Sequence, residues 1–326
     1  MTLKSRLTPL IKAATEGNLI RISRLLREGA RVDAMIFEHG YEFSTLSAPG
    51  KGRNFLRPPL WADLGKTRQS TTALACALEN RRYAAMRLLI QRGADVQKRI
   101  FVFGRSVSLF QYACALGDVS ALKILLFSKN PGDLRQLLKT ATSYRNVKTV
   151  RYLLARRADP NATVNGTPIW FLADTPRLLG TFFGHGANPG ATDHLGRTYL
   201  FFHMLGEYAN MKLFLSKGGK VRGRDREGKT LLHYAAGPAG PRFPYIVAKT
   251  LIKAGARLNA RDEKGITPLM EAAQVHKNTR IIRLLLASGA NAALKNNREQ
   301  TALDYAKELI DNQAVLRVLG NKRKIG

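Results

Sequence analysis

The chain has 326 residues and a formal net charge of +30 at pH 7, because 53 Lys and Arg residues outnumber 23 Asp and Glu residues. A hydrophobic content of 45% excludes general disorder. No apolar run approaches the ~18 residues needed to cross a membrane, and residues 1–30 have neither the apolar core nor the cleavage site of a secretory signal. We therefore expect a folded, basic, cytoplasmic protein, with the nucleus or the interior of a host cell as alternatives.

The first predicted element is a pair of helices. Its first helix opens at Thr8-Pro9-Leu10, where the threonine can accept a backbone N–H and the proline has none to leave unbonded. Leu25-Leu26 belongs to the apolar stripe of the second helix, and Gly29-Ala30 ends it because glycine readily adopts the left-handed conformation. A unit of this size buries too little apolar surface to fold alone, so it needs neighbours.

A non-repeat insertion follows at about residues 35–69. Within it, residues 35–44 place apolar side chains on both sides of His39-Gly40, which predicts a β-hairpin. A second hairpin is predicted at residues 100–104, before the helix that opens at Ser108. Two roles are open for both hairpins: they cover hydrophobic surface of the stack, or they hold a partner.

The remaining elements repeat the first pair. Variants of Thr-Pro-Leu open a predicted helix, in steps of 36, 28, 31, 31, 32, 37 and 34 residues, at Thr72, Ser108, Gln136, Thr167, Thr198, Thr230, Thr267 and Thr301. Small residues let neighbouring first helices approach closely, and six units carry an alanine five residues after the opening: Ala13, Ala77, Ala113, Ala141, Ala235 and Ala272. The unit at Gln136 lacks both the threonine and the glycine, and residues 171–180 are too degenerate to predict a helix.

A period near 33 residues with these fixed landmarks resembles the ankyrin repeat family. The best copies are residues 8–18 (TPLIKAATEGN), 228–236 (GKTLLHYAA) and 255–273 (GARLNARDEKGITPLMEAA). The resemblance implies an all-α ankyrin-repeat solenoid of about nine helix-turn-helix units with hairpin fingers, some of them degenerate, forming a single domain over residues 1–326. It also implies a scaffold for protein–protein interaction.

Residues 223–230, GRDREGKT, match the phosphate-binding pattern G-x-x-x-x-G-K-[ST]. Such a loop needs a strand directly before it, whereas the preceding apolar segment, residues 211–215, has the character of the second helix of a repeat. Its aspartate, glycine and threonine also fall where the copy at residues 255–273 carries the same three residues. We therefore expect a repeat turn here rather than a nucleotide site.

The sequence contains no recognisable catalytic pattern: no nucleophile elbow, no Cys–His arrangement and no kinase signature. Cys76 and Cys114 match no metal spacing and are too few for a disulfide framework, so we expect two buried thiols in a reducing compartment. No histidine pairs with another at a metal-binding helical spacing; the six are His39, His185, His194, His203, His233 and His276. We expect no enzymatic activity, no metal and no cofactor.

The positive charge predicts an anionic partner. Basic residues cluster at several places, including Arg81-Arg82, Arg156-Arg157 and residues 217–229, although a charge run is usually a solvated face. In the ankyrin family, partners contact turn residues that flank the glycine and residues that follow the alanine pair on the first helix. Carried over by resemblance, the candidate partner-binding residues are Arg68, Arg105, Arg197, Arg226, Lys229, Lys264 and Gln274.

These observations support a non-enzymatic scaffold with a basic concave surface that binds an acidic protein partner. Nucleic-acid binding is an alternative, ranked lower because the sequence lacks the interleaved aromatic and basic residues of common nucleic-acid modules. A secreted effector that binds host proteins is a further alternative. The short basic segment at residues 322–324 is also compatible with nuclear import.

Overall fold

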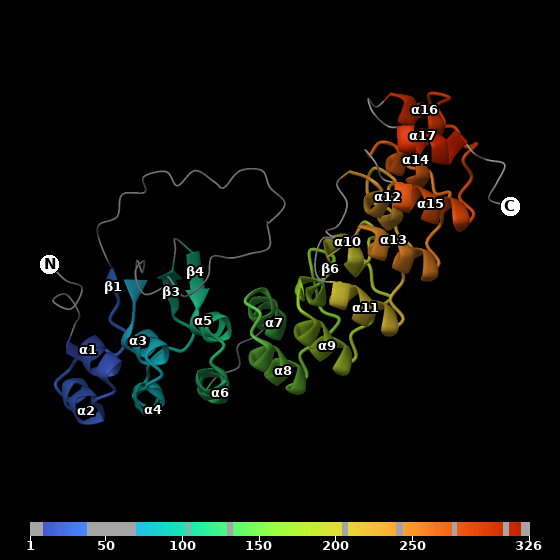
Figure 1. Cartoon of the computed structure of the whole chain (residues 1–326). Helices are drawn as coiled ribbons and strands as arrows, with labels where there is room; N and C mark the ends of the chain where they lie inside the picture. Colours follow the sequence, from blue (N-terminus) through green and yellow to red (C-terminus); the bar gives the residue numbers. More distant parts are fainter. Residues whose placement is uncertain are drawn as a thin grey trace. The chain divides into compact units, whose positions relative to one another are not determined.

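The computed structural model describes residues 9–37, 70–102, 105–128, 133–203, 208–238, 244–275, 279–308 and 313–320. The chain divides into two compact units, Met1–Ala162 and Thr163–Gly326, which we describe separately. In both units, pairs of antiparallel helices follow one another along the chain (Figure 1). The described residues hold nine such pairs, which confirms the predicted all-α solenoid. None of the described helices is long and apolar enough to cross a membrane.

In the first unit, the first helices of successive pairs contact one another, and so do the second helices. The first helices are α1 (Pro9–Glu16), α3 (Ala73–Glu79), α5 (Leu109–Leu116) and α7 (Leu134–Ser143). The second helices are α2 (Leu19–Arg27), α4 (Tyr83–Gln91), α6 (Val119–Ser128) and α8 (Val147–Ala155). Each helix therefore buries its apolar side against its own partner and against the same helix of the next pair.

The second unit continues the pattern. Its first helices are the 3-10 helix η3 (Ile169–Leu172), α10 (Tyr199–His203), α12 (Leu231–Ala236), α14 (Pro268–Ala273) and α16 (Ala302–Lys307). Its second helices are α9 (Pro176–Gly184), α11 (Tyr208–Ser216), α13 (Pro244–Lys253), α15 (Thr279–Ala287) and α17 (Gln313–Gly320). Helices α12, α14 and α16 contact in sequence, as do α13, α15 and α17.

Four of the residues that were predicted to open first helices act as side-chain caps: Thr72, Ser108, Thr267 and Thr301. The hydroxyl of Thr198 is buried without a hydrogen-bond partner among the described residues, and η3 begins at Ile169 without a side-chain cap. The hydroxyl of Thr72 accepts a hydrogen bond from the N–H of Ala75 (3.2 Å), and that of Ser108 accepts one from the N–H of Gln111 (3.2 Å). The six predicted alanines are all fully buried, at 0% exposure. Capping and close helix packing thus explain why this short motif recurs.

The helix start predicted at Gln136 is wrong. Helix α7 begins at Leu134 rather than after Gln136, because the carboxylate of Asp133 caps it by accepting the N–H of Arg135 (2.9 Å). Aspartate is a stronger cap than glutamine, so the helix gains residues at its start.

The degenerate unit also has a defined structure. Residues 169–172 form the short helix η3, and α9 begins at Pro176 with the hydroxyl of Thr175 accepting from the N–H of Leu178 (3.4 Å). Bulky aromatic rings fill this core: Trp170 stacks on Tyr199 with ring centroids 5.4 Å apart, and Tyr199 stacks on His203 at 4.3 Å. Large aromatic side chains take the place of alanine packing in this unit.

Three short antiparallel strand pairs join the helix pairs. Strand β3 (Arg99–Val102) pairs with β4 (Arg105–Ser108), which confirms the second predicted hairpin, and β5 (Thr163–Val164) pairs with β6 (Thr167–Pro168). Strand β1 (Ile36–Phe37) pairs with β2 (Ser70–Thr71), so the two ends of the insertion meet. The rest of the predicted hairpin at residues 35–44, from residue 38 onward, lies outside the described residues.

Left-handed residues follow the second helices, as predicted. Gly29 after α2 has a φ of 90°, and Gly255 after α13 has a φ of 84°. In the unit that lacks the glycine, Arg157 takes this conformation with a φ of 66°. The left-handed conformation costs a residue with a Cβ atom about 1–2 kcal/mol, so the arginine stores strain at this position.

Candidate functional site

Four finger turns in the second unit share one local structure. Each begins with Asp or Asn, whose side-chain oxygen accepts the backbone N–H groups two and four residues later. The Oδ1 atom of Asp225 accepts from Glu227 (3.0 Å) and Lys229 (2.9 Å), and that of Asp262 accepts from Lys264 (2.9 Å) and Ile266 (2.8 Å). The turns at Asp193 and Asn296 repeat this pattern. These oxygens hold the turns, as side chains of this length commonly do.

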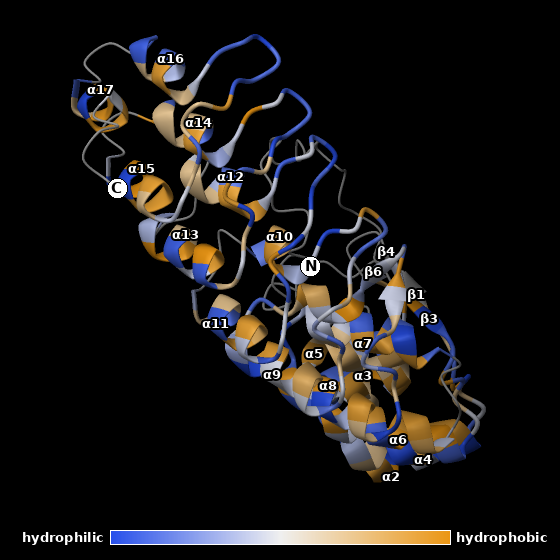
Figure 2. Cartoon of the chain, turned by 90° about the vertical axis from the view of Figure 1, so that its right-hand side faces the viewer, coloured by the Kyte–Doolittle hydropathy of each residue, from blue (hydrophilic) through white to orange (hydrophobic). Residues whose placement is uncertain are grey.

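Hydrogen bonds also connect consecutive turns. The N–H of Glu263 donates to the carbonyl of Glu227 (3.0 Å), and the N–H of Asn297 donates to the carbonyl of Lys264 (3.0 Å). The guanidinium of Arg224 donates to the carbonyls of Gly228 and Arg261. Figure 2 shows these turns as hydrophilic loops beside α12, α14 and α16. We call the turns at residues 225–228, 262–265 and 296–299 the finger edge.

The finger edge explains residues 223–230. They contain no strand, and α11 is the element that precedes them. The N–H groups of Glu227 and Lys229 bond to the Asp225 side chain, and that of Gly228 bonds to the Asp225 carbonyl (3.1 Å). A phosphate-binding loop needs free N–H groups that converge on the anion. The predicted repeat turn is confirmed.

Two of the predicted partner-binding residues lie at the tips of the finger edge. Arg226 and Lys264 are both exposed, and neither forms an ion pair with another described residue. Each has an exposed glutamate beside it, Glu227 and Glu263. The tips therefore present alternating charges on a backbone that is already ordered.

Lys229 is half-buried next to the finger edge. Its Nζ atom lies 3.1 Å from the Oε1 of Glu271 on α14 and 3.6 Å from the Oε2 of Glu227, and its side chain is 25% exposed. Burial opposes the charge on Lys229, but Glu271, followed by Glu227 and Asp262, outweighs it, so the pKa of Lys229 is raised. Lys229 therefore joins two repeats.

His233 forms another link between these repeats. Its Nδ1 atom accepts the N–H of Thr230 (3.0 Å), so its Nε2–H donates to the carbonyl of Ile266 (3.0 Å). Burial lowers the pKa of His233, more than the bond to Ile266 raises it. His233 is 1% exposed, which agrees with a structural role for this histidine.

The surroundings of the other predicted partner-binding residues, Arg197, Gln274, Arg105 and Arg68, differ from one another. Arg197 is held by Asp193, with Nη2 2.8 Å from Oδ2, and its guanidinium lies 4.9 Å from the ring centroid of Phe202. Gln274 is half-buried at the end of α14. The backbone of Arg105 lies in β4, but its side chain is outside the described part of the chain, as is all of Arg68.

Asp193 is ionised within this arrangement. Its burial favours the neutral acid, but the backbone N–H and the guanidinium of Arg197 favour the carboxylate more strongly, so the pKa of Asp193 is lowered. Arg197 therefore stabilises its own turn.

The structure also shows that the charged residues of the described second helices are all basic, which was not predicted from the sequence. The nine second helices of the described chain carry fourteen Lys and Arg residues, all exposed, and no Asp or Glu. Counting charges separately for first and second helices in the sequence would have found it. We call the outward side of these helices in each unit the second-helix face.

Other sequence expectations concern metals and thiols. Cys76 and Cys114 are both buried, as predicted, and burial raises the pKa of the Cys114 thiol. Among the described residues, no three His, Cys, Asp or Glu side chains gather in a group that could hold a metal ion.

Comparison with protein families finds two overlapping matches in the second unit. The family described as "Ankyrin repeats (many copies)" matches residues 251–306, and the family described as "Ankyrin repeat" matches residues 227–263. Together these matches cover residues 227–306, which include the finger edge from Glu227 onward but not Asp225 and Arg226.

Curated proteins are similar over parts of their length. The "Putative palmitoyltransferase ZDHHC13" of Danio rerio is 26% identical over 185 residues, which are 53% of this chain and 27% of that protein. The "Putative ankyrin repeat protein FPV034" of fowlpox virus is 31% identical over 33% of this chain and 26% of its own length. The "Ankyrin repeat and LEM domain-containing protein 1 homolog" of Caenorhabditis elegans is 36% identical over 26% of this chain and 12% of its own length. This chain thus spans less than a third of each relative.

Among solved structures, the ankyrin repeat domain of Bcl-3 aligns with 97% of this chain and 99% of its own chain. The sequence identity is 20% and the TM-score is 0.40.

Proposed function

This chain is an ankyrin repeat protein, and from that premise we propose that its finger edge binds an acidic protein partner. Ankyrin repeats serve as protein–protein interaction scaffolds, and the fold is typically non-enzymatic.

The observation that carries the proposal is the state of Arg226 and Lys264. Both protrude from turns whose backbone is fixed by the side chains of Asp225 and Asp262. Both are exposed and lack an ion-pair partner among the described residues. A partner therefore meets two cations without the entropic cost of ordering the loops that carry them.

The glutamates beside these cations favour a protein partner over nucleic acid. Glu227 and Glu263 would repel a uniformly negative phosphate backbone along the same edge. A protein surface can place carboxylates opposite Arg226 and Lys264 and basic or polar groups opposite the glutamates. Gln274, at the end of α14, supplies an additional polar contact.

The experiment compares the wild-type chain with Arg226→Gln/Lys264→Gln in a quantitative pull-down at two salt concentrations, after nuclease treatment. We expect an acidic protein that binds the wild type and is largely lost with the double variant. The matched control is Lys212→Gln/Lys249→Gln, which removes the same charge from second helices and should retain that partner. Equal capture by both double variants would contradict the proposal, and so would loss of every partner after nuclease.

A further inference from the structure

The second-helix face differs in charge from the rest of the molecule. At the overall ratio of 53 basic to 23 acidic residues, about four of its fourteen charged side chains would be acidic, yet none is among those described. The fourteen are Arg21, Arg24, Arg27, Arg87, Lys123, Lys148, Arg151, Arg177, Lys212, Lys249, Lys253, Arg280, Arg283 and Arg317.

Several acidic residues instead accept hydrogen bonds from backbone N–H groups at helix starts and in turns. Asp118 and Asp133 cap α6 and α7, and Asp304 caps α16 from within its first turn. Asp225 and Asp262 hold finger turns. These acids are therefore occupied at helix starts and turns, and the described second helices carry no acid of their own, although Glu16 of α1 lies 3.8 Å from Arg21 on α2.

Large apolar side chains protrude among these cations. Five large hydrophobic residues of the described chain are exposed, and four of them lie on second helices: Leu19 and Ile20 on α2, Phe127 on α6 and Ile246 on α13. Phe127 is 95% exposed and Ile20 is 81% exposed.

Three tyrosines on these helices lie beneath cations. The Nζ of Lys212 lies 5.5 Å from the ring centroid of Tyr208, and the guanidinium of Arg280 lies 4.6 Å from that of Tyr245. Tyr152 on α8 has both Lys123 (5.6 Å) and Arg156 (5.8 Å) over its ring. The face thus combines ammonium and guanidinium groups with amphipathic aromatic rings.

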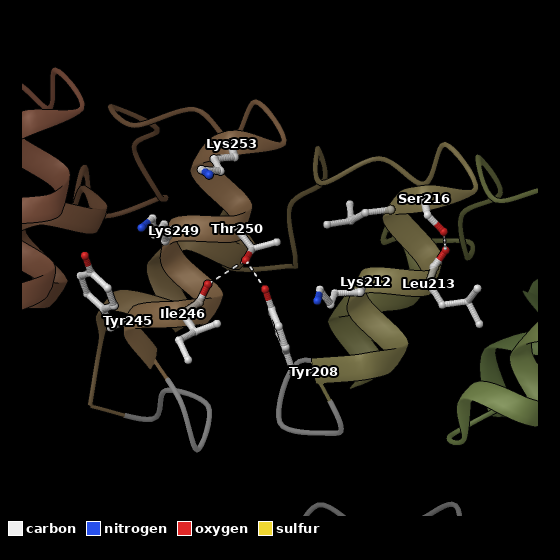
Figure 3. A pocket seen from close by; sticks show the side chains of 10 residues that line it. Tyr208, Lys212, Leu213, Ser216, Tyr245, Ile246, Lys249, Thr250 and Lys253 are labelled. Carbon is white, nitrogen blue, oxygen red and sulfur yellow. Dashed lines mark hydrogen bonds between the residues drawn. The ribbon is translucent and has the colours of Figure 1, made fainter.

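In the second unit, a groove of about 820 Å³ opens on this face between α11 and α13. Figure 3 shows Lys212 on α11 and Lys249 and Lys253 on α13 around it, with the hydroxyls of Tyr208 and Thr250 2.9 Å apart between the helices. The exposed Ile246 also lines the groove, and none of its lining residues is acidic.

We propose that the second-helix face binds the surface of a lipid bilayer that contains anionic lipids. Cations attract such a surface, apolar side chains insert at the boundary of headgroups and acyl chains, and tyrosine suits the interface because its ring is apolar and its hydroxyl polar. Lysine and arginine can extend their charged ends to headgroups while their stems cover apolar surface. This surface is distinct from the finger edge.

Nucleic acid fits the same observations less well. A phosphate backbone offers no contact for Phe127, Ile20 or Ile246. Single-stranded nucleic acid is held by bases that stack on open aromatic faces, whereas Tyr152, Tyr208 and Tyr245 already have cations on their rings. An acidic protein is less suitable because protein surfaces usually carry both signs of charge, whereas the described second helices carry only basic residues.

The test is sedimentation of the full chain with vesicles of phosphatidylcholine and phosphatidylserine (4:1) and with phosphatidylcholine alone. We expect binding only to the mixed vesicles, decreasing as salt rises. One variant replaces six cations of the second-helix face with glutamine: Arg24, Lys123, Arg151, Lys212, Lys249 and Arg283. It should weaken binding by about two orders of magnitude or more.

The matched control removes the same charge from first helices and turns, by replacing with glutamine Lys12, Arg135, Arg226, Lys264, Lys295 and Arg298. It should keep most of the vesicle binding, and circular dichroism should show both variants folded. Equal losses in the two variants would show a non-specific charge effect and overturn the proposal. Absence of wild-type binding to the mixed vesicles would overturn it too.

A second variant separates insertion from charge attraction. Phe127→Ser/Ile246→Ser keeps every cation, and we expect it to lose vesicle binding mainly at high salt, where insertion contributes most. A parallel measurement uses duplex DNA. If the second-helix face binds DNA under conditions in which the vesicles do not bind, the membrane proposal is wrong and the face is a nucleic-acid surface.

Discussion

The Nζ atom of Lys229 lies 3.1 Å from the Oε1 atom of Glu271, and this ion pair joins the finger turn of one repeat to the first helix of the next. The carboxylate is largely buried, with a side-chain exposure of 9%. Lys229, which the sequence alone would place on the surface, therefore has a structural partner. The exposed binding candidates of the finger edge are Arg226 and Lys264.

The first prediction concerns this pair. Glu271→Gln should lower the free energy of unfolding by about 1–2 kcal/mol, because it leaves the part-buried ammonium of Lys229 without its main counter-charge. Chemical denaturation measures the loss, and a double-mutant cycle with Lys229→Met isolates the pair. A coupling free energy near zero would show that the pair does not hold the repeats together.

Much of this fold could be predicted because its determinants are local. The cap at Thr72, the buried alanine at Ala113 and the left-handed glycine at Gly255 each act within a few residues, so their spacing in the sequence identifies helix pairs. The turn at residues 223–230 was identified for the same reason, by analogy with a better copy.

What could not be predicted depends on contacts between distant residues. The ion pair between Lys229 and Glu271 and the pairing of residues 36–37 with residues 70–71 join positions far apart in the sequence. The aromatic core around Trp170 replaces the alanine motif through tertiary packing, so the repeat pattern gave no sign of it. The start of α9 at Thr175-Pro176 did carry the usual local signal, but it opens a second helix rather than a first.

The second prediction concerns strain at the end of α8. Arg157→Gly should raise the free energy of unfolding by about 1 kcal/mol, since Arg157 has a φ of 66°. The matched control is the neighbouring Arg156→Gly. Arg156 has a φ of −92°, so glycine relieves no strain there and should destabilise the protein by about 0.5–1 kcal/mol. Thermal denaturation of both variants should shift the melting temperature in opposite directions; shifts of the same sign would contradict this account.

The third prediction tests the close packing of first helices. Ala113→Leu should destabilise the chain by about 1–3 kcal/mol, because Ala113 is 0% exposed on α5, which packs against α3 and α7. Ala84→Leu makes the same change at an exposed position of α4 and should change stability by less than about 0.5 kcal/mol. Equal effects in urea denaturation would mean that the buried alanines do not set the helix spacing.

The fourth prediction is a dependence of stability on pH. Burial lowers the pKa of His233 and of His203 in the folded chain, and the hydrogen bonds to backbone carbonyls only partly offset it. The unfolded chain takes up protons at these residues near their ordinary pKa of 6.5, before the folded chain does. The free energy of unfolding should therefore be highest above pH 6.5 and fall as the pH decreases below that value.

Thermal melts between pH 7.5 and pH 5 measure this effect, and His233→Gln should flatten the curve because one of the two histidines no longer titrates. Carboxylates such as Asp193, whose pKa is lowered, lose their contribution only at more acidic pH. A melting temperature that stays constant from pH 7.5 to pH 5 would show that these histidines are not buried as described.

The most direct measurement for the proposed scaffold function is site-specific photo-crosslinking. A photoreactive phenylalanine analogue is placed at Arg226 or Lys264 on the finger edge, or at the exposed Arg151 on α8 as a control. After nuclease treatment, we expect one acidic protein to be crosslinked from positions 226 and 264 and not from position 151. Crosslinks to that protein from position 151 alone, or equally from all three positions, would contradict binding at the finger edge.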